Sequence, residues 1–141
     1  MVRAAVVFYP NGSREKLLAV AKALAKGIES RGHQVDVIDG SRDLHTKLTA
    51  YQYIAVGSEP ASFISSKIAP ELGRFLAQAG MVGGKRCFGF VLKKGFTSNR
   101  ALRNLMKVME AEGMFLRFSE VLGSPEDAEE VGKRLLVEQT G

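Results

Sequence analysis

The sequence predicts a doubly wound α/β fold of three layers, in which a five-stranded parallel sheet is covered by helices on both faces. Three observations carry this prediction. Short runs of β-forming residues alternate with longer stretches of helical period. The first run is apolar on both of its faces, as a strand buried inside a parallel sheet must be. The stretches between the runs are mostly long enough to serve as crossover helices.

The first unit along the chain is a strand followed by an amphipathic helix. Arg3–Phe8 is nearly all apolar after its first residue and is expected to be the first strand. Apolar residues then recur at helical spacing from Leu17 to Ile28, and Gly32 supplies a signal for the end of that helix. Gln34–Ile38 is the expected second strand.

The third strand is expected at Tyr53–Val56, where an apolar run ends at Gly57. The segment 39–52 before it contains two leucines and has room for a short helix. Pro70 is expected to open the next helix, because a proline in the first turn sacrifices no hydrogen bond. Gly80 ends the helical pattern.

The second half of the chain repeats the alternation. Arg86–Leu92 is the expected fourth strand, and Thr97 or Ser98 caps a helix that closes at Gly113. Met114–Phe118, with a continuation toward Leu122 left open, is the expected fifth strand.

A last helix is expected to begin at Ser124. Ser124 is followed by Pro125 and by two acidic residues, a combination that resembles a capping box with proline in the first turn. The acids there would also complement the positive end of the helix dipole.

Length and composition restrict the class of protein. The 141 residues, 45% of them hydrophobic, predict one globular domain over 1–141. The single Cys87 excludes an internal disulfide and fits a reducing compartment. No apolar run approaches the roughly 20 residues that a membrane span needs. We therefore expect a soluble cytoplasmic protein with no membrane partner.

The net charge of +5 is unevenly distributed. Residues 85–107 contain seven basic residues and no acidic one. Such a basic band is typical either of a solvated helix face or of a surface that meets an anionic ligand or partner. Nucleic acid is not the favoured partner, because no recognition motif for it is present.

Three loops are the expected place for a ligand, because ligands of such sheets bind beyond the carboxyl ends of the strands. They are 9–14, 57–63 and 93–97. In the first loop, the backbone N–H groups at a helix start and the freedom of Gly12 favour a phosphate cradle, with Asn11, Ser13 and Arg14 as further donors. The same residues also make an ordinary turn and helix cap.

These loops resemble those of the flavodoxins. In that family the first loop reads Ser/Thr-x-Thr-Gly-x-Thr and wraps the phosphate of FMN. The chain reads Tyr-Pro-Asn-Gly-Ser-Arg at 9–14, which keeps the glycine and replaces the three hydroxyls. Gly-Ser-Glu-Pro at 57–60 resembles the Gly-Ser-Pro-Thr stretch of the family, and residues 123–127 and 132–135 resemble its final helix. The resemblance implies the strand order 2-1-3-4-5 and FMN as cofactor.

The resemblance also implies positions for the flavin ring. Flavodoxins supply aromatic side chains from the loops after strands three and four, where this chain offers Phe63 and Phe96. Either phenylalanine can instead be a core or loop-packing residue. Glu59 can accept a hydrogen bond from the ring or be an exposed loop carboxylate. Lys93 and Lys94 replace an acidic surround, so a flavin held there would have a raised reduction potential.

Two functions remain open on the sequence. The first is an electron carrier that binds FMN between these loops and docks an acidic redox partner at its basic band, with an on-rate that falls as salt rises. The second is a degenerate module of the same fold that lacks flavin and binds another anion or an acidic protein. The predicted site is the same set of residues for both: Asn11, Gly12, Ser13, Arg14, Ser58, Glu59, Phe63, Lys93, Lys94, Gly95 and Phe96.

Catalytic and metal sites are not predicted. The first loop has no cysteine nucleophile, the third strand ends in Gly57 rather than in a phosphorylatable aspartate, and no nucleotide-binding glycine motif follows the first strand. His33 and His45 are expected to be surface residues. An electron carrier is therefore favoured over an enzyme, with a flavin-dependent reductase as a third alternative.

Overall fold

The computed structural model describes residues 1–137 and contains one parallel sheet of five strands. The strands are β1 (Arg3–Phe8), β2 (Gln34–Asp39), β3 (Tyr53–Ser58), β4 (Arg86–Leu92) and β5 (Phe115–Leu122). Their order in the sheet is β2-β1-β3-β4-β5, and every neighbouring pair is parallel. The predicted fold class and strand order are confirmed.

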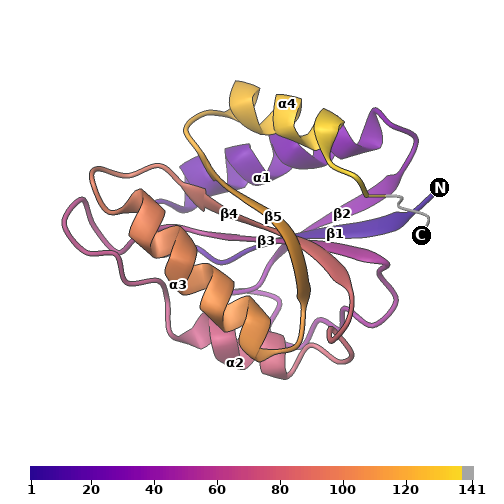
Figure 1. Ribbon diagram of the computed structural model, residues 1–141, viewed down its shortest axis with the longest axis horizontal. Helices are drawn as coiled ribbons and strands as arrows, with labels where there is room; N and C mark the ends of the chain where they lie inside the picture. Colours follow the sequence, from indigo (N-terminus) through magenta and orange to yellow (C-terminus); the bar gives the residue numbers. More distant parts are fainter. Residues whose placement is uncertain (138–141) are drawn as a thin grey trace.

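Four helices flank this sheet: α1 (Arg14–Glu29), α2 (Glu71–Ala77), α3 (Ser98–Ala111) and α4 (Pro125–Arg134). The helices α1 and α4 lie side by side on one face, and α2 and α3 lie on the other (Figure 1). The Ser124 side chain accepts a hydrogen bond from the Asp127 N–H, which is the cap that the sequence predicts. No helix within residues 1–137 is long and apolar enough to cross a bilayer.

The segment 40–52 forms turns, and the short helix expected there is wrong. Its only two leucines do not make an apolar stripe, because Leu48 is buried whereas Leu44 is 52% exposed. The Leu48 N–H donates to the Ala79 carbonyl oxygen beyond α2, and the hydrogen bonds within the segment are those of turns, such as Tyr51 N–H to the Leu48 carbonyl oxygen.

Two apolar clusters, one on each face of the sheet, form the core. Cys87 is fully buried in the cluster under α2 and α3, and burial raises the pKa of its thiol to about 12. The thiol is therefore protonated at neutral pH and behaves as a small apolar side chain, as the sequence predicts.

The reversal of strand order between β1 and β3 creates a crevice at the carboxyl edge of the sheet. The chain leaves β1 toward α1 on one face and leaves β3 toward α2 on the other (Figure 1). The loops that follow β1, β3 and β4 consequently open beside one another at this edge. These three loops carry the predicted site residues.

Candidate functional site at the carboxyl edge of the sheet

The three loops converge at one edge of the sheet, as the sequence predicts, and hydrogen bonds join them. The Ser58 hydroxyl at the end of β3 donates to the Tyr9 carbonyl oxygen over 2.9 Å. The Asn11 side chain in the first loop reaches the Lys67 carbonyl oxygen of the second. The Thr97 hydroxyl in the third loop reaches the carbonyl oxygens of Ser62 and Ser65. The loops therefore form one connected rim.

Glu59 lies at the centre of this rim and is fully buried. Its Oε2 accepts hydrogen bonds from the backbone N–H of Asn11 at 2.9 Å and of Ser13 at 3.0 Å. Its Oε1 accepts from the Lys94 ammonium at 2.7 Å. The expectation of an exposed loop carboxylate is wrong, because β3 is the central strand and the first and third loops cover the residue that follows it.

The Glu59 carboxylate occupies two of the backbone donors in the loop that the sequence assigns to a phosphate cradle, the Asn11 and Ser13 N–H groups. Burial by itself would raise the pKa of this carboxyl, but the hydrogen bonds from Asn11, Lys94 and Ser13 outweigh burial and hold the pKa below its ordinary value. The group is therefore ionised at neutral pH. An intramolecular anion thus occupies these two first-loop amides and neutralises Lys94 of the third loop.

Lys94 takes part in the same group of hydrogen bonds around Glu59. Its side chain is 12% exposed and also donates to the Pro60 carbonyl oxygen. Gly95 beside it has a φ of +59°, and a Cβ there would lie 2.7 Å from the Phe63 carbonyl oxygen. Only glycine allows this close approach, which holds the third loop against the second. Lys93, by contrast, is exposed.

Arg14 points away from the first-loop amides. Its Nε donates to Oδ2 of Asp39 at 2.8 Å, and its guanidinium lies over the Phe8 ring. Asp39 ends the neighbouring strand β2 and is buried, so it offers Arg14 a desolvated partner. The hydrogen bonds from Ser41 and Arg14 outweigh burial and hold the pKa of Asp39 below its ordinary value.

The two predicted aromatic residues are both on the surface. Phe63 is 66% and Phe96 100% exposed, so their interpretation as core residues is wrong. Phe63 lines a large pocket, whereas Phe96 borders a separate, smaller hollow beside Lys93 and Asn99. The two rings therefore do not face one common cavity.

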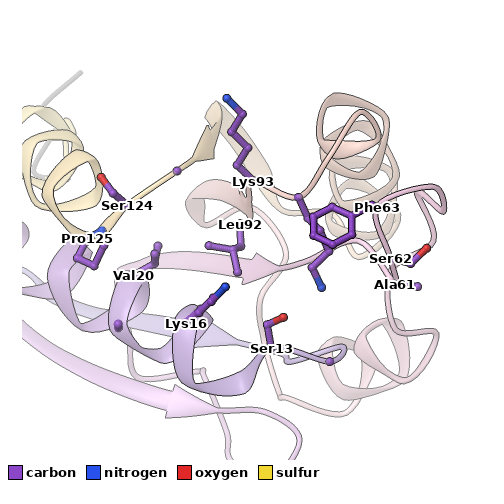
Figure 2. A pocket seen from close by; sticks show the side chains of 14 residues that line it. Ser13, Lys16, Val20, Ala61, Ser62, Phe63, Leu92, Lys93, Ser124 and Pro125 are labelled. Carbon is purple, nitrogen blue, oxygen red and sulfur yellow. The ribbon is translucent and has the colours of Figure 1, made fainter.

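The large pocket has a volume of about 730 Å³ and lies between the rim and the adjacent ends of α1 and α4 (Figure 2). Sequence reasoning identified the side formed by the three loops and missed the side formed by the two helices. The missed lining residues are Lys16, Ala19 and Val20 on α1 and Gly123, Ser124 and Pro125 at the start of α4. Their positions in the sequence could have indicated them. Lys16, Ala19 and Val20 lie in the first two turns of the helix after β1, and residues 123–125 directly follow β5.

The described residues do not fit the phosphate end of FMN. Two of the first-loop amides, those of Asn11 and Ser13, donate to Glu59, and the buried cation beside them, Lys94, is neutralised by the same carboxylate. The pocket has room for a planar ring, but it presents one exposed phenylalanine instead of an aromatic sandwich. The binding roles of the predicted site residues stay predictions.

Several flavodoxins are among the solved structures that are similar to this chain. A flavodoxin from the domain Archaea is 25% identical, with a TM-score of 0.66 over 92% of this chain and 94% of its own. Oxidised Flavodoxin 1 from Bacillus cereus is 15% identical, with a TM-score of 0.73 over 97% and 99%. The flavodoxin of Streptococcus pneumoniae TIGR4 is 14% identical, with a TM-score of 0.70 over the same shares. No protein-family model and no curated protein matches the sequence.

Proposed function

We propose that this chain, which is flavodoxin-like over nearly its whole length, is a binding module that works without FMN. The observation that supports the proposal is the buried Glu59 carboxylate, which accepts hydrogen bonds from the Asn11 and Ser13 amides and from the Lys94 ammonium. The module would instead bind an acidic protein partner or another anion at a different part of its surface.

The energetic argument is that a phosphate could use the first-loop amides only by displacing the Glu59 carboxylate. A phosphate that entered the first loop would have to expel an ionised, fully buried carboxylate from three hydrogen bonds. Breaking a buried ion pair costs about 3–5 kcal/mol. If Glu59 stayed in place, the phosphate would instead meet a like charge and would lack the Asn11 and Ser13 amides as donors. Either way, the affinity that the phosphate normally contributes is lost.

An FMN-dependent electron carrier is the second candidate. Two observations favour it: the matched solved structures include several flavodoxins, and the pocket beside the rim is large enough for a planar ring. It differs from the first candidate in one measurable property, the binding of FMN by the unmodified protein.

The first test removes the carboxylate that occupies the first-loop amides. Replacing Glu59 with Ser should free the Asn11 and Ser13 amides and leave the Lys94 ammonium beside them. We expect 10 mM inorganic phosphate to raise the melting temperature of Glu59→Ser by roughly 3–5 °C, because a ligand of the folded state stabilises it. The melting temperature of the wild type should not respond beyond the general effect of the salt.

The matched control is Glu15→Ser, which removes one exposed acid from the first turn of α1 and leaves Glu59 in place. It should respond to phosphate as the wild type does. The wild type itself should purify colourless and should not bind added FMN in a fluorescence titration. A yellow wild type with stoichiometric FMN would reject the proposal in favour of the electron carrier.

The acidic partner is assigned to the exposed face of α3. Arg100, Arg103 and Lys107 recur at helical spacing on this face, are all exposed, and form no ion pair within residues 1–137. Cations without partners on one face match an acidic protein segment by charge complementarity. A solvated face with no partner is the alternative outcome of the test.

Charge reversal tests this surface. We expect Arg103→Glu/Lys107→Glu to weaken the binding of polyglutamate at low salt by about ten-fold, measured by fluorescence anisotropy, since reversed charges remove attraction and add repulsion. Lys22→Glu/Lys26→Glu on α1 carries the same charge change on the opposite face of the sheet and should have less effect. Equal effects of the two variants, or no binding by the wild type, would exclude a docking surface on α3.

A further inference from the structure

We propose that the pocket between the rim, α1 and α4 binds an aromatic monocarboxylate, an amphipathic anion that carries no phosphate. The inference rests on the proposed function in one respect, since it takes the phosphate cradle to be closed by Glu59. It goes beyond that function by assigning a second, separate site and the chemistry of its ligand.

The apolar part of the pocket suits a flat ring. Leu92 and Val20 form its buried floor, and Phe63, Ala19 and Pro125 are lining side chains that remain exposed (Figure 2). A ring laid between them would remove this apolar surface from water, which is favourable in proportion to the area covered. The site is concave and largely preformed, as sites for small ligands usually are.

The charge of the pocket selects an anion. The Lys16 side chain extends from α1 toward Leu92, into the space that the lining residues enclose (Figure 2). This ammonium forms no ion pair with any residue of the described chain, 1–137. The Ser13 hydroxyl also lines the pocket and has no hydrogen-bond partner among these residues. Together they offer one charge-assisted donor and one neutral donor to a carboxylate.

The charged side chains around the pocket favour a ligand with one negative charge over a ligand with two. The charge of Lys94 is cancelled by Glu59 at 2.7 Å, so Lys94 contributes no net attraction. Lys93 extends away from the floor of the pocket in Figure 2. Lys93 also lines the pocket, so of the two lining lysines without an ion pair in the described part of the chain, Lys16 is the one that extends toward the floor (Figure 2). A phosphate monoester carries nearly two charges at neutral pH, and its second charge would have no partner at the floor of the pocket.

The test uses 2-naphthoate as the probe, with 2-naphthalenemethanol and 2-naphthyl phosphate as the neutral and phosphorylated analogues. Titrations followed by ¹H–¹⁵N correlation spectra should show saturable shifts for 2-naphthoate at amides around the pocket. We expect Lys16→Gln to weaken 2-naphthoate about five-fold, the effect of one partly solvated ion pair. Lys22→Gln, which alters an exposed lysine of the same helix outside the pocket, should have no effect.

Two further comparisons distinguish the contribution of the Lys16 charge to binding from the contribution of the cavity. Lys16→Gln should leave the weaker binding of 2-naphthalenemethanol unchanged, because the alcohol has no charge to lose. Ala19→Phe should abolish binding of both compounds by filling the pocket, while circular dichroism shows an intact fold.

The inference is overturned if 2-naphthoate does not saturate by about 5 mM, close to the weakest affinity that a specific site of this size should give. It is also overturned if the shifts lie elsewhere, if Lys16→Gln and Lys22→Gln behave alike, or if 2-naphthyl phosphate binds more tightly than 2-naphthoate. Failure of the proposed function is recognised separately, by binding of FMN to the wild type. A protein that binds neither FMN nor 2-naphthoate contradicts this inference alone.

Discussion

Glu59→Gln is expected to lower the free energy of unfolding by about 3 kcal/mol, the largest loss for a change of so few atoms. The substitution preserves shape but leaves the Lys94 ammonium without its counter-ion in a site that is 12% exposed. Breaking a buried ion pair costs about 3–5 kcal/mol, and the residual exposure of Lys94 puts the expected loss at the lower end. Urea denaturation followed by circular dichroism measures it.

The decrease in stability at acidic pH tests the same prediction by an independent measurement. Because the pKa of Glu59 is lower in the folded protein than the ordinary value of 4.5, its carboxylate stabilises the fold fully above that pH. This contribution is lost as the pH falls from about 4.5 through the folded-state pKa. The free energy of unfolding of Glu59→Gln should therefore fall less steeply with acid than that of the wild type. Asp39, whose pKa is also lowered, keeps part of the slope in both proteins.

The partners of Glu59 also supply a control. Lys94→Met removes the cation and leaves the carboxylate with its two amide donors, so it should destabilise the fold and also raise the pKa of Glu59. Glu59→Leu/Lys94→Met removes both charges but leaves the Asn11 and Ser13 amides without an acceptor, and it should remain less stable than the wild type. A loss below 1 kcal/mol in Glu59→Gln would contradict the assignment of Glu59 as the anion of the first loop.

The sequence was sufficient for the architecture because the architecture depends on short-range patterns. Alternating strand and helix periods predict a parallel sheet, and a parallel sheet places every carboxyl end at one edge. The convergence of the three loops follows from this geometry and needs no knowledge of side chains. The capping residue Ser124 was likewise readable, because its acceptor and donor are three residues apart.

The sequence could not predict the burial of Glu59, because that depends on residues far along the chain. An acid in a Gly-Ser-Glu-Pro loop suggests an exposed residue, since carboxylates are seldom buried without partners. Its partners are the amides of the first loop, 46 and 48 residues earlier, and the Lys94 ammonium, 35 residues later. Arg14 illustrates the same limit, because its side chain selects Asp39 on the neighbouring strand over the loop beside it.

Gly27→Ala is the second change with a large expected effect, and it acts where α1 packs on α4. A Cβ at Gly27 would lie 2.2 Å from the Glu129 carbonyl oxygen and 2.9 Å from the Cα of Gly132. A Cβ at Gly132 would lie 2.4 Å from the Leu24 carbonyl oxygen. Since these atoms belong to the backbone, no side-chain rotation relieves the clash, and the two helices must move apart.

We expect Gly27→Ala to lower the free energy of unfolding by about 2–3 kcal/mol, the usual cost of overfilling a close-packed contact, measured by urea denaturation. Gly73→Ala is the matched control, because it is also a helical glycine but its Cβ would meet only Val108 at an ordinary 3.6 Å. Alanine has the higher helix propensity, so Gly73→Ala should raise stability by about 0.5–1 kcal/mol. Equal and small effects at both positions would show that α1 and α4 are not in backbone contact.

The same substitution connects the packing of the helices to the pocket. Ala19 and Val20 on α1 and Pro125 on α4 all line the cavity, so its shape depends on how closely the two helices approach each other. Separation of the helices at Gly27 should therefore weaken 2-naphthoate binding, although Gly27 does not line the pocket. Gly73→Ala leaves both helices in place and should not change binding. A more weakly binding Gly27→Ala protein that is still folded would indicate that helix packing, as well as the loops, sets the shape of the site.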